Sequence, residues 1–342
     1  MPIATNTPAA ISWDFLTAIA SHRHEERHNR PVRQLVRIGL PAVVVLLVGM
    51  AVSGVLTPPR YPGLPETPFL TLVLTPIGRA ALFTSGTFGV GLILVGGLLS
   101  REPRMLRLAA RVSAGFSASA VFMIVMTLAN ILAVQPWQAL DPTVTTSFLT
   151  QIDEGRYLML QVLLGIVAAW VVARAQHGIE IVFALLALGI AVVLPAFTGH
   201  SASSVSHWIA SATMLLHLGA MMVWVGGALA LVLVRHDAAV ITRFSAVAIG
   251  AYALLIVSGA ASLYTRVASW NDFFHDRYMW FVVAKIVGAA VLGVLGFRNL
   301  QMVKAQFPDD SAVLFRRTLI IESGLMLVVI ALAVTLARMA NP

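Results

Sequence analysis

Residues 178–198 read GIEIVFALLALGIAVVLPAFT. Glu180 is the single charged residue in this run, and it stands at the N-terminal edge. An α-helix rises 1.5 Å per residue, so about 20 apolar residues cross the roughly 30 Å hydrocarbon core of a bilayer. The stretch is therefore predicted to be a transmembrane helix, and similar stretches recur on both sides of it.

The whole chain follows the same pattern. Of its 342 residues, 58% are hydrophobic and 11% are charged, whereas soluble domains carry about 25% charged residues. Segments rich in proline or charge separate the apolar runs. This composition predicts an all-α fold, a polytopic transmembrane helical bundle of about nine spans. The predicted spans are 35–56, 76–99, 112–134, 156–174, 178–198, 205–234, 240–264, 278–300 and 314–337.

The basic residues predict the orientation of the bundle. The net charge is +8 and the isoelectric point is near 10.7. With a cytoplasmic N-terminus, sixteen Lys and Arg residues fall in inner segments and five in outer ones. Because Lys and Arg accumulate on the cytoplasmic side, we expect N-in and C-out, and we attribute the charge to topology rather than to nucleic-acid binding. The chain has no cysteine, which excludes disulfides and thiolate metal sites.

The N-terminal 34 residues form a separate polar region. Residues 1–34 are predicted to be a cytoplasmic basic tail, followed by a three-span region at 35–134. The tail contains His and charged residues clustered at 22–28. Contact with anionic lipid is one interpretation of this cluster, and a metal-sensing tail is the other.

Histidine and methionine gather around the predicted sixth span. His200 and His207 are expected at its outer side, and His217 follows ten residues deeper. Met214, His217 and Met221 share one helix face because they fall at i, i+3 and i+7. Imidazole and thioether are ligands that suit copper. The pattern favours a copper route, although single Met residues usually pack and single interfacial His residues often serve as hydrogen-bonding anchors.

Other unusual residues lie inside predicted spans. Glu322 is expected near the midplane, at the depth of His217. A carboxyl group there requires a proton or a partner, so Glu322 is predicted to compensate the charge of a cation, relay a proton or bond a neighbouring helix. Gly226-Gly227 and the run Gly86-x-x-Gly89-x-Gly91 predict close helix packing.

Several short motifs in the second half of the chain resemble the copper-resistance CopD family. The resemblance covers roughly residues 155–337, which are identified as a CopD-like membrane domain, and 35–134 is similar to the family's more variable part. The motifs are Gly199-His200-Ser201-Ala202, His207, Leu216-His217-Leu218, Trp224-Val225-Gly226-Gly227-Ala228-Leu229, Arg243-Phe244-Ser245, Ser258-Gly259, Ala284-Lys285, Arg298-Asn299, Arg317 and Glu322.

The resemblance implies a multi-pass protein of the bacterial plasma (inner) membrane that moves copper inward or confers copper tolerance. It also implies His200, His207 and His217 as copper ligands, whereas Met214 and Met221 follow from helix geometry. Expected partners are membrane lipid, a separate CopC-like extracytoplasmic copper-binding protein and a CtaG-like oxidase assembly factor.

Two other functions stay open from the sequence. One is a haem-binding b-type membrane cytochrome, which would need axial His ligands. The other is an assembly factor that delivers copper to a respiratory oxidase. We expect no enzymatic activity, and the sequence contains neither a Walker A segment nor a P-type ATPase phosphorylation motif.

Overall fold

A computed structural model describes residues 39–53, 56, 63, 65–197, 207–233, 238–266, 270–275, 277–304 and 309–337. The expected N-terminal tail with its His cluster lies outside these residues, as does His200. His207 belongs to a described helix, but its side chain is not among those described.

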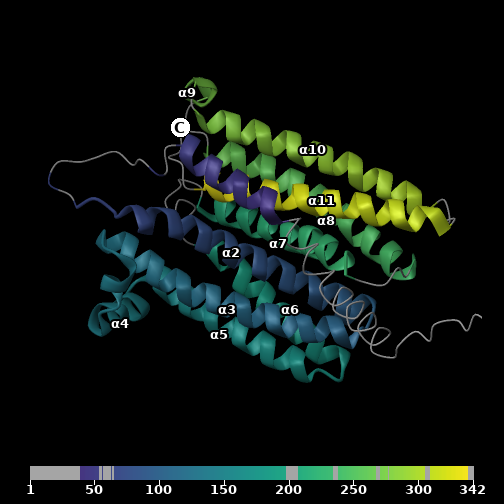
Figure 1. The fold of residues 1–342 in the computed structure, drawn as a ribbon, viewed down its shortest axis with the longest axis horizontal. Coiled ribbons are helices and arrows are strands. Elements are labelled where there is room, and N and C mark those ends of the chain that lie inside the picture. Colours follow the sequence, from purple (N-terminus) through teal and green to yellow (C-terminus); the bar gives the residue numbers. More distant parts are fainter. Residues whose placement is uncertain are drawn as a thin grey trace, which may run out of the picture.

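Helices make up the regular structure of the described part, and no strand occurs there. The short helix α4 and the one-turn helix α9 connect longer ones (Figure 1). In chain order the elements are a helix at Gly39–Val52, α2 at Phe69–Ile93, the π-helical turn η1 at Leu94–Leu99, α3 at Pro103–Leu132, η2 at Pro136–Ala139, α4 at Pro142–Gln151, α5 at Asp153–Arg174, α6 at Gly178–Val193, η3 at Leu194–Phe197, α7 at His207–Leu231, α8 at Ala238–Arg266, α9 at Trp270–His275, α10 at Arg277–Lys304 and α11 at Asp309–Leu336.

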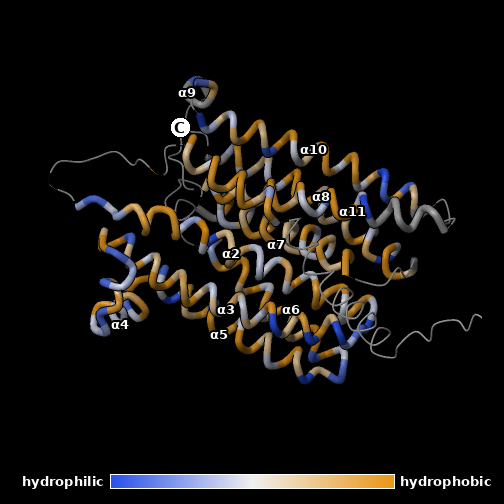
Figure 2. Tube along the Cα trace, in the orientation of Figure 1, coloured by the Kyte–Doolittle hydropathy of each residue, from blue (hydrophilic) through white to orange (hydrophobic). Residues whose placement is uncertain are grey.

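The predicted polytopic helical bundle is confirmed. Within the described ranges, eight helices are long and apolar enough to cross a membrane. The first expected span, 35–56, is described as the shorter apolar helix Gly39–Val52, which would extend over about 21 Å. Figure 2 shows hydrophobic residues along the helices and hydrophilic ones concentrated at their ends.

Two helices begin well before the predicted spans. The second helix begins at Phe69 instead of residue 76, and Pro76 lies inside its first turns. The third begins at Pro103 instead of residue 112, because Pro103 occupies a first-turn position that needs no backbone N–H partner. In α3 the added turns contain arginines that hydropathy excludes from a span, whereas in α2 the added residues 69–75 are mostly apolar and the helix continues through Pro76.

The chain runs alternately up and down through the bundle. Helices α4 and α9 and the end of α11 lie at one end of the molecule in Figure 1, and the loop between α5 and α6 lies at the other. The connections expected on the outer side are therefore gathered at one end of the bundle. We refer to that end as the outer end, in keeping with the predicted orientation.

Helix α2 lies at the centre of the bundle. Figure 1 shows α3, α5 and α6 on one side of it and α8, α10 and α11 on the other, while α7 packs directly on α2. Glycines permit this contact, as the sequence predicted. A methyl group on Gly91 would overlap the Gly226 carbonyl, and one on Gly226 would overlap the Thr87 carbonyl. The backbones of α2 and α7 thus touch without intervening side chains.

Two further glycines, one in α2 and one in α7, leave room for side chains of neighbouring helices. Gly86 leaves room for Phe116 of α3 and Val192 of α6, and Gly227 lies against the ring of Phe244 of α8. A substituent at any of these glycines would have to displace a packed side chain.

We predict that Gly226→Ala destabilises the folded bundle by about 1–3 kcal/mol, because the new methyl group meets backbone rather than a movable side chain. Thermal unfolding of the purified protein in detergent measures this. Gly250→Ala in α8 is the matched control, since no heavy atom lies within 4 Å of its added carbon. Equal midpoints for the two variants would show that the α2–α7 backbone contact does not limit stability.

Candidate functional site: a His and Met route along α7

The predicted ligands that the structure describes lie on α7. Met214, His217 and Met221 are partly buried, and the continuous helix keeps their expected spacing. Two contacts identify the direction of this face. His217 meets Ser258 of α8, and seven residues further along α7 Trp224 meets Tyr252 of the same helix. The His and Met face of α7 therefore points towards α8.

A contact with Ser258 of α8 orients the His217 ring. Nδ1 lies 3.2 Å from the Oγ of Ser258, which is buried. The Ser258 hydroxyl donates to the Leu254 carbonyl at 2.6 Å, so its oxygen can accept from His217 in the tautomer that carries the proton on Nδ1. This tautomer places the lone pair on Nε2, the arrangement that a metal-ligating imidazole needs.

Gly259 provides the space for this ring. A Cβ at position 259 would lie 3.3 Å from Cε1 of His217 and 3.6 Å from Nδ1. Contacts at 3.0–3.4 Å are tighter than most, so a larger residue would push the imidazole away from Ser258. The adjacent pair Ser258-Gly259 thus supplies both the hydrogen-bond partner and the room.

Below His217 an aromatic pair joins three helices. The rings of Trp224 and Tyr252 meet edge to face, with centroids 4.8 Å apart and planes at 62°. The Tyr252 hydroxyl donates to the Ala289 carbonyl of α10 at 2.9 Å. Trp224 is buried, so bulky side chains fill the α7–α8 interface about 10 Å deeper than His217.

Glu322 is buried, with 4% of its surface exposed, between α11 and α10. Asn299 of α10 donates from Nδ2 to its Oε2 at 2.5 Å. The other amide atom, Oδ1 of Asn299, has no hydrogen-bond partner in the described part of the chain. Asn299 belongs to the Arg298-Asn299 motif, but its role was not predicted, because its partner on α11 comes close to it only when the helices pack.

Glu322 lies further from the outer end of the bundle than the sequence suggested. Ser258 is six residues, about 9 Å, from Tyr264 at the outer end of its span. Asn299 is three residues, about 5 Å, from Met302 at the inner end of α10's span. The Tyr252–Ala289 bond sets α8 and α10 in register. Glu322 and its partner therefore lie roughly 20 Å further in than His217, rather than at the same depth.

A charged pair near the outer end was also missed. Arg79 of α2 lies inside the predicted span 76–99. The structure pairs Arg79 with Glu154 in the first turn of α5, at 3.6 Å. Two residues 75 positions apart give no local signal of this contact.

No group of three His, Asp or Glu side chains comes together as a metal site among the described residues. The predicted set of His200, His207 and His217 is not assembled there, because the first lies outside the described ranges and the side chain of the second is not described. Their joint coordination of copper stays a prediction.

Two family models match the chain. The model "Copper resistance protein D-like, N-terminal domain" matches residues 28–208, and the model "Copper resistance protein D" matches residues 238–336. Most of α7, with His217, lies between the two matches. The comparisons with curated proteins and with solved structures found no match.

These matches cover more than half of the chain, and the helices they span are long, apolar and arranged as a bundle. The protein therefore belongs to the copper resistance protein D family, and it is a multi-pass membrane protein related to copper resistance and transport.

Proposed function

We propose that this protein carries copper ions across the bacterial plasma membrane from the outer side, along the face of α7 that packs on α8. The observation that supports this most is the setting of His217. Its ring lies partly buried inside the bundle, and the contact between Nδ1 and the Ser258 hydroxyl orients it, as partners of metal-ligating imidazoles do.

The expected ligands on α7 and in the segment before it would form a series of weak sites. His200 and His207 receive the ion at the outer surface, and His217 takes it inward with Met214 and Met221 on the same face. Imidazole binds copper in either common oxidation state, and thioether favours Cu(I). Several weak sites let an ion enter and leave, whereas one complete cage would retain it.

In the inner half of the proposed route, an aromatic pair and a carboxyl group take the place of the His and Met ligands. The aromatic pair of Trp224 and Tyr252 blocks direct passage between α7 and α8, so the ion moves when these rings rearrange. Near the inner end, the Glu322 carboxyl group offsets the positive charge of the ion. The membrane potential drives inward movement, since one charge gains about 2.3 kcal/mol per 100 mV.

We further infer that the protein acts as a transporter and not as an enzyme. A separate CopC-like protein on the outer side would deliver copper to His200 and His207, and a CtaG-like assembly factor would receive it. The lipid of the membrane is the remaining partner, through the exposed apolar faces of helices such as α8 and α10.

The described histidines bear on the alternative of a haem protein. Among histidines whose side chains the structure describes, His177 and His275 are exposed at helix ends, and His217 alone lies within a span. A buried haem held by two axial His residues has no such pair in this part of the bundle. An absorption spectrum separates the alternatives, because bound haem gives a Soret band that shifts on reduction.

We predict that His217→Ala lowers cellular copper accumulation while the protein still inserts in the membrane. Ser258→Ala should weaken copper binding by about tenfold, as loss of a partner that orients a ligand does, and less than His217→Ala. Elemental analysis of cells and of purified protein measures both. His177→Ala, at an exposed helix end, is the control. Normal accumulation by a well-expressed His217→Ala protein would remove this residue from the route.

A second prediction separates charge from packing at Glu322. Glu322→Gln keeps an acceptor for Asn299 and should change stability by less than about 1 kcal/mol, yet it should reduce transport. Asn299→Leu removes the donor from a buried carboxyl group and should cost about 1–3 kcal/mol. Detergent unfolding and copper accumulation are measured side by side. Wild-type transport by Glu322→Gln would rule out charge compensation by this residue.

A further inference from the structure

A row of arginines at the inner end of α3 has no role in the route along α7. Arg104, Arg107 and Arg111 fall at i, i+3 and i+7, so they share one face of the helix. All three are exposed. Met105 and Ala109 are buried, and at 100° per residue they lie on the opposite side of the helix. The three arginines therefore face away from the bundle.

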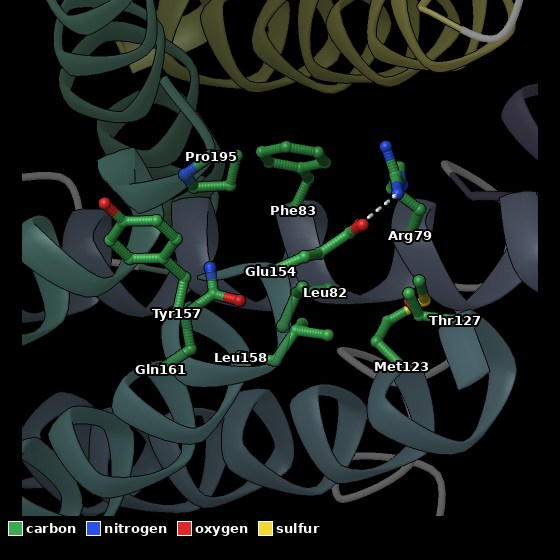
Figure 3. A pocket seen from close by; sticks show the side chains of 10 residues that line it. All are labelled: Arg79, Leu82, Phe83, Met123, Thr127, Glu154, Tyr157, Leu158, Gln161 and Pro195. Atoms are coloured by element: carbon green, nitrogen blue, oxygen red, sulfur yellow. Dashed lines mark ion pairs between the residues drawn. The ribbon is translucent and has the colours of Figure 1, made fainter. Parts of the chain in front are cut away.

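These arginines have no counter-charge within the protein. In the described part of the chain, no ion pair joins any of them to a carboxylate. Glu102, the acidic residue nearest in sequence, precedes α3 as its N-cap residue and pairs with none of them. Arg79 near the outer end differs, because it faces the Glu154 carboxylate (Figure 3). Three unpaired guanidinium groups on one helix face favour an anionic partner from outside the chain.

The depth of the arginines matches the layer of lipid headgroups. They precede the apolar part of α3, which begins at residue 112, and extend over about 11 Å of helix. The interfacial layer of a bilayer adds about 5–8 Å on each side of the hydrocarbon core. On the neighbouring helix α5, Trp170 lies one turn from the inner end, is 59% exposed and has Arg174 over its ring at 4.8 Å. Tryptophan is enriched at this level of a membrane.

Beyond the arginines, the same helix face continues as a low apolar surface. Gly115, Ala118 and Phe122 follow Arg111 at four, seven and eleven residues, and all three are exposed. A Cβ added at Gly115 would meet no heavy atom within 4 Å. Phe122 lies about 16 Å beyond Arg111, which is close to half of the roughly 30 Å hydrocarbon core. The face thus combines a cationic section with an apolar section as deep as one leaflet.

We propose that this face of α3 binds an anionic phospholipid of the inner leaflet. The lipid phosphate accepts hydrogen bonds from the three guanidinium groups, whose planar fork suits phosphate oxygens. One acyl chain lies along Gly115 and Ala118 towards Phe122. Helix α3 stands on the other side of α2 from α8 (Figure 1), so this site is separate from the proposed copper route and does not depend on it.

Titration of phosphatidylglycerol into purified full-length protein in detergent tests the site, with binding followed by native mass spectrometry. Phosphatidylethanolamine with the same acyl chains is the zwitterionic reference. The unaltered protein should bind phosphatidylglycerol at least about tenfold more tightly, because each arginine near an anionic lipid contributes roughly fivefold. Arg104→Gln/Arg107→Gln/Arg111→Gln should abolish this preference. The corresponding triple Lys variant keeps the charge but not the fork, and should weaken binding by only about two- to fivefold.

Two further variants separate a built site from the general positive charge of the inner end. Exposed arginines also stand near the inner ends of α8, α10 and α11. Arg243→Gln/Arg298→Gln/Arg317→Gln removes the same charge from these helices and should retain the preference for phosphatidylglycerol. Gly115→Leu leaves every charge in place and fits without a clash. It should weaken phosphatidylglycerol binding about two- to fivefold, because the new side chain occupies the path of the acyl chain.

Selective loss in the α3 triple Gln variant and in Gly115→Leu supports the proposal. Equal loss in the two triple Gln variants would reveal a general charge effect and overturn it. Wild-type binding by Gly115→Leu, together with displacement of phosphatidylglycerol by millimolar inorganic phosphate, would indicate an anion site without acyl-chain contact and overturn the assignment to a lipid. If the α3 triple Gln variant fails to insert, Arg107→Gln alone replaces it, with an expected loss of about fivefold, and wild-type binding by this variant also overturns the proposal.

Discussion

The contact between the backbones of α2 and α7 constrains the rest of this bundle. Gly91 and Gly226 leave no room for even a methyl group between the two helices. In a bilayer, helices associate through close packing and hydrogen bonds, because lipid tails are as apolar as the side chains they would replace. This contact joins α2, in the region matched by the N-terminal family model, to a helix that lies mostly outside both matches, and α7 in turn packs on α8.

The same contact fixes how α7 is turned about its axis. Successive residues of a helix differ by 100°, so Gly226 and His217, nine positions apart, point in opposite directions. Once Gly226 faces α2, His217 must face α8, where Ser258 and Gly259 receive its ring. The orientation of the proposed copper ligand therefore depends on a glycine about 13 Å further along the helix that touches no ion.

The sequence predicts features that depend on one helix and fails where two distant helices must meet. Hydropathy located the spans, and small residues at Gly86, Gly91 and Gly226 indicated close packing. The partners Ser258, Asn299 and Glu154 were not found, because each pairing joins residues tens of positions apart. The depth of Glu322 was misjudged because a hydropathy window shows the apolar part of a helix but not its register against α10.

The polar groups of the interior occupy distinct levels, and this separation bears on how a cation crosses. Arg79 and Glu154 lie near the outer end, His217 about 9 Å into its span, and Glu322 roughly 20 Å deeper. Between the last two, Trp224 and Tyr252 fill the interface. A permanent chain of ligands would bridge this gap and leave the membrane open to ions. In the proposed route, two polar stations divided by an aromatic barrier would let an ion reach one side while the other stays closed, so movement of the barrier, rather than affinity at either station, would set the rate of passage.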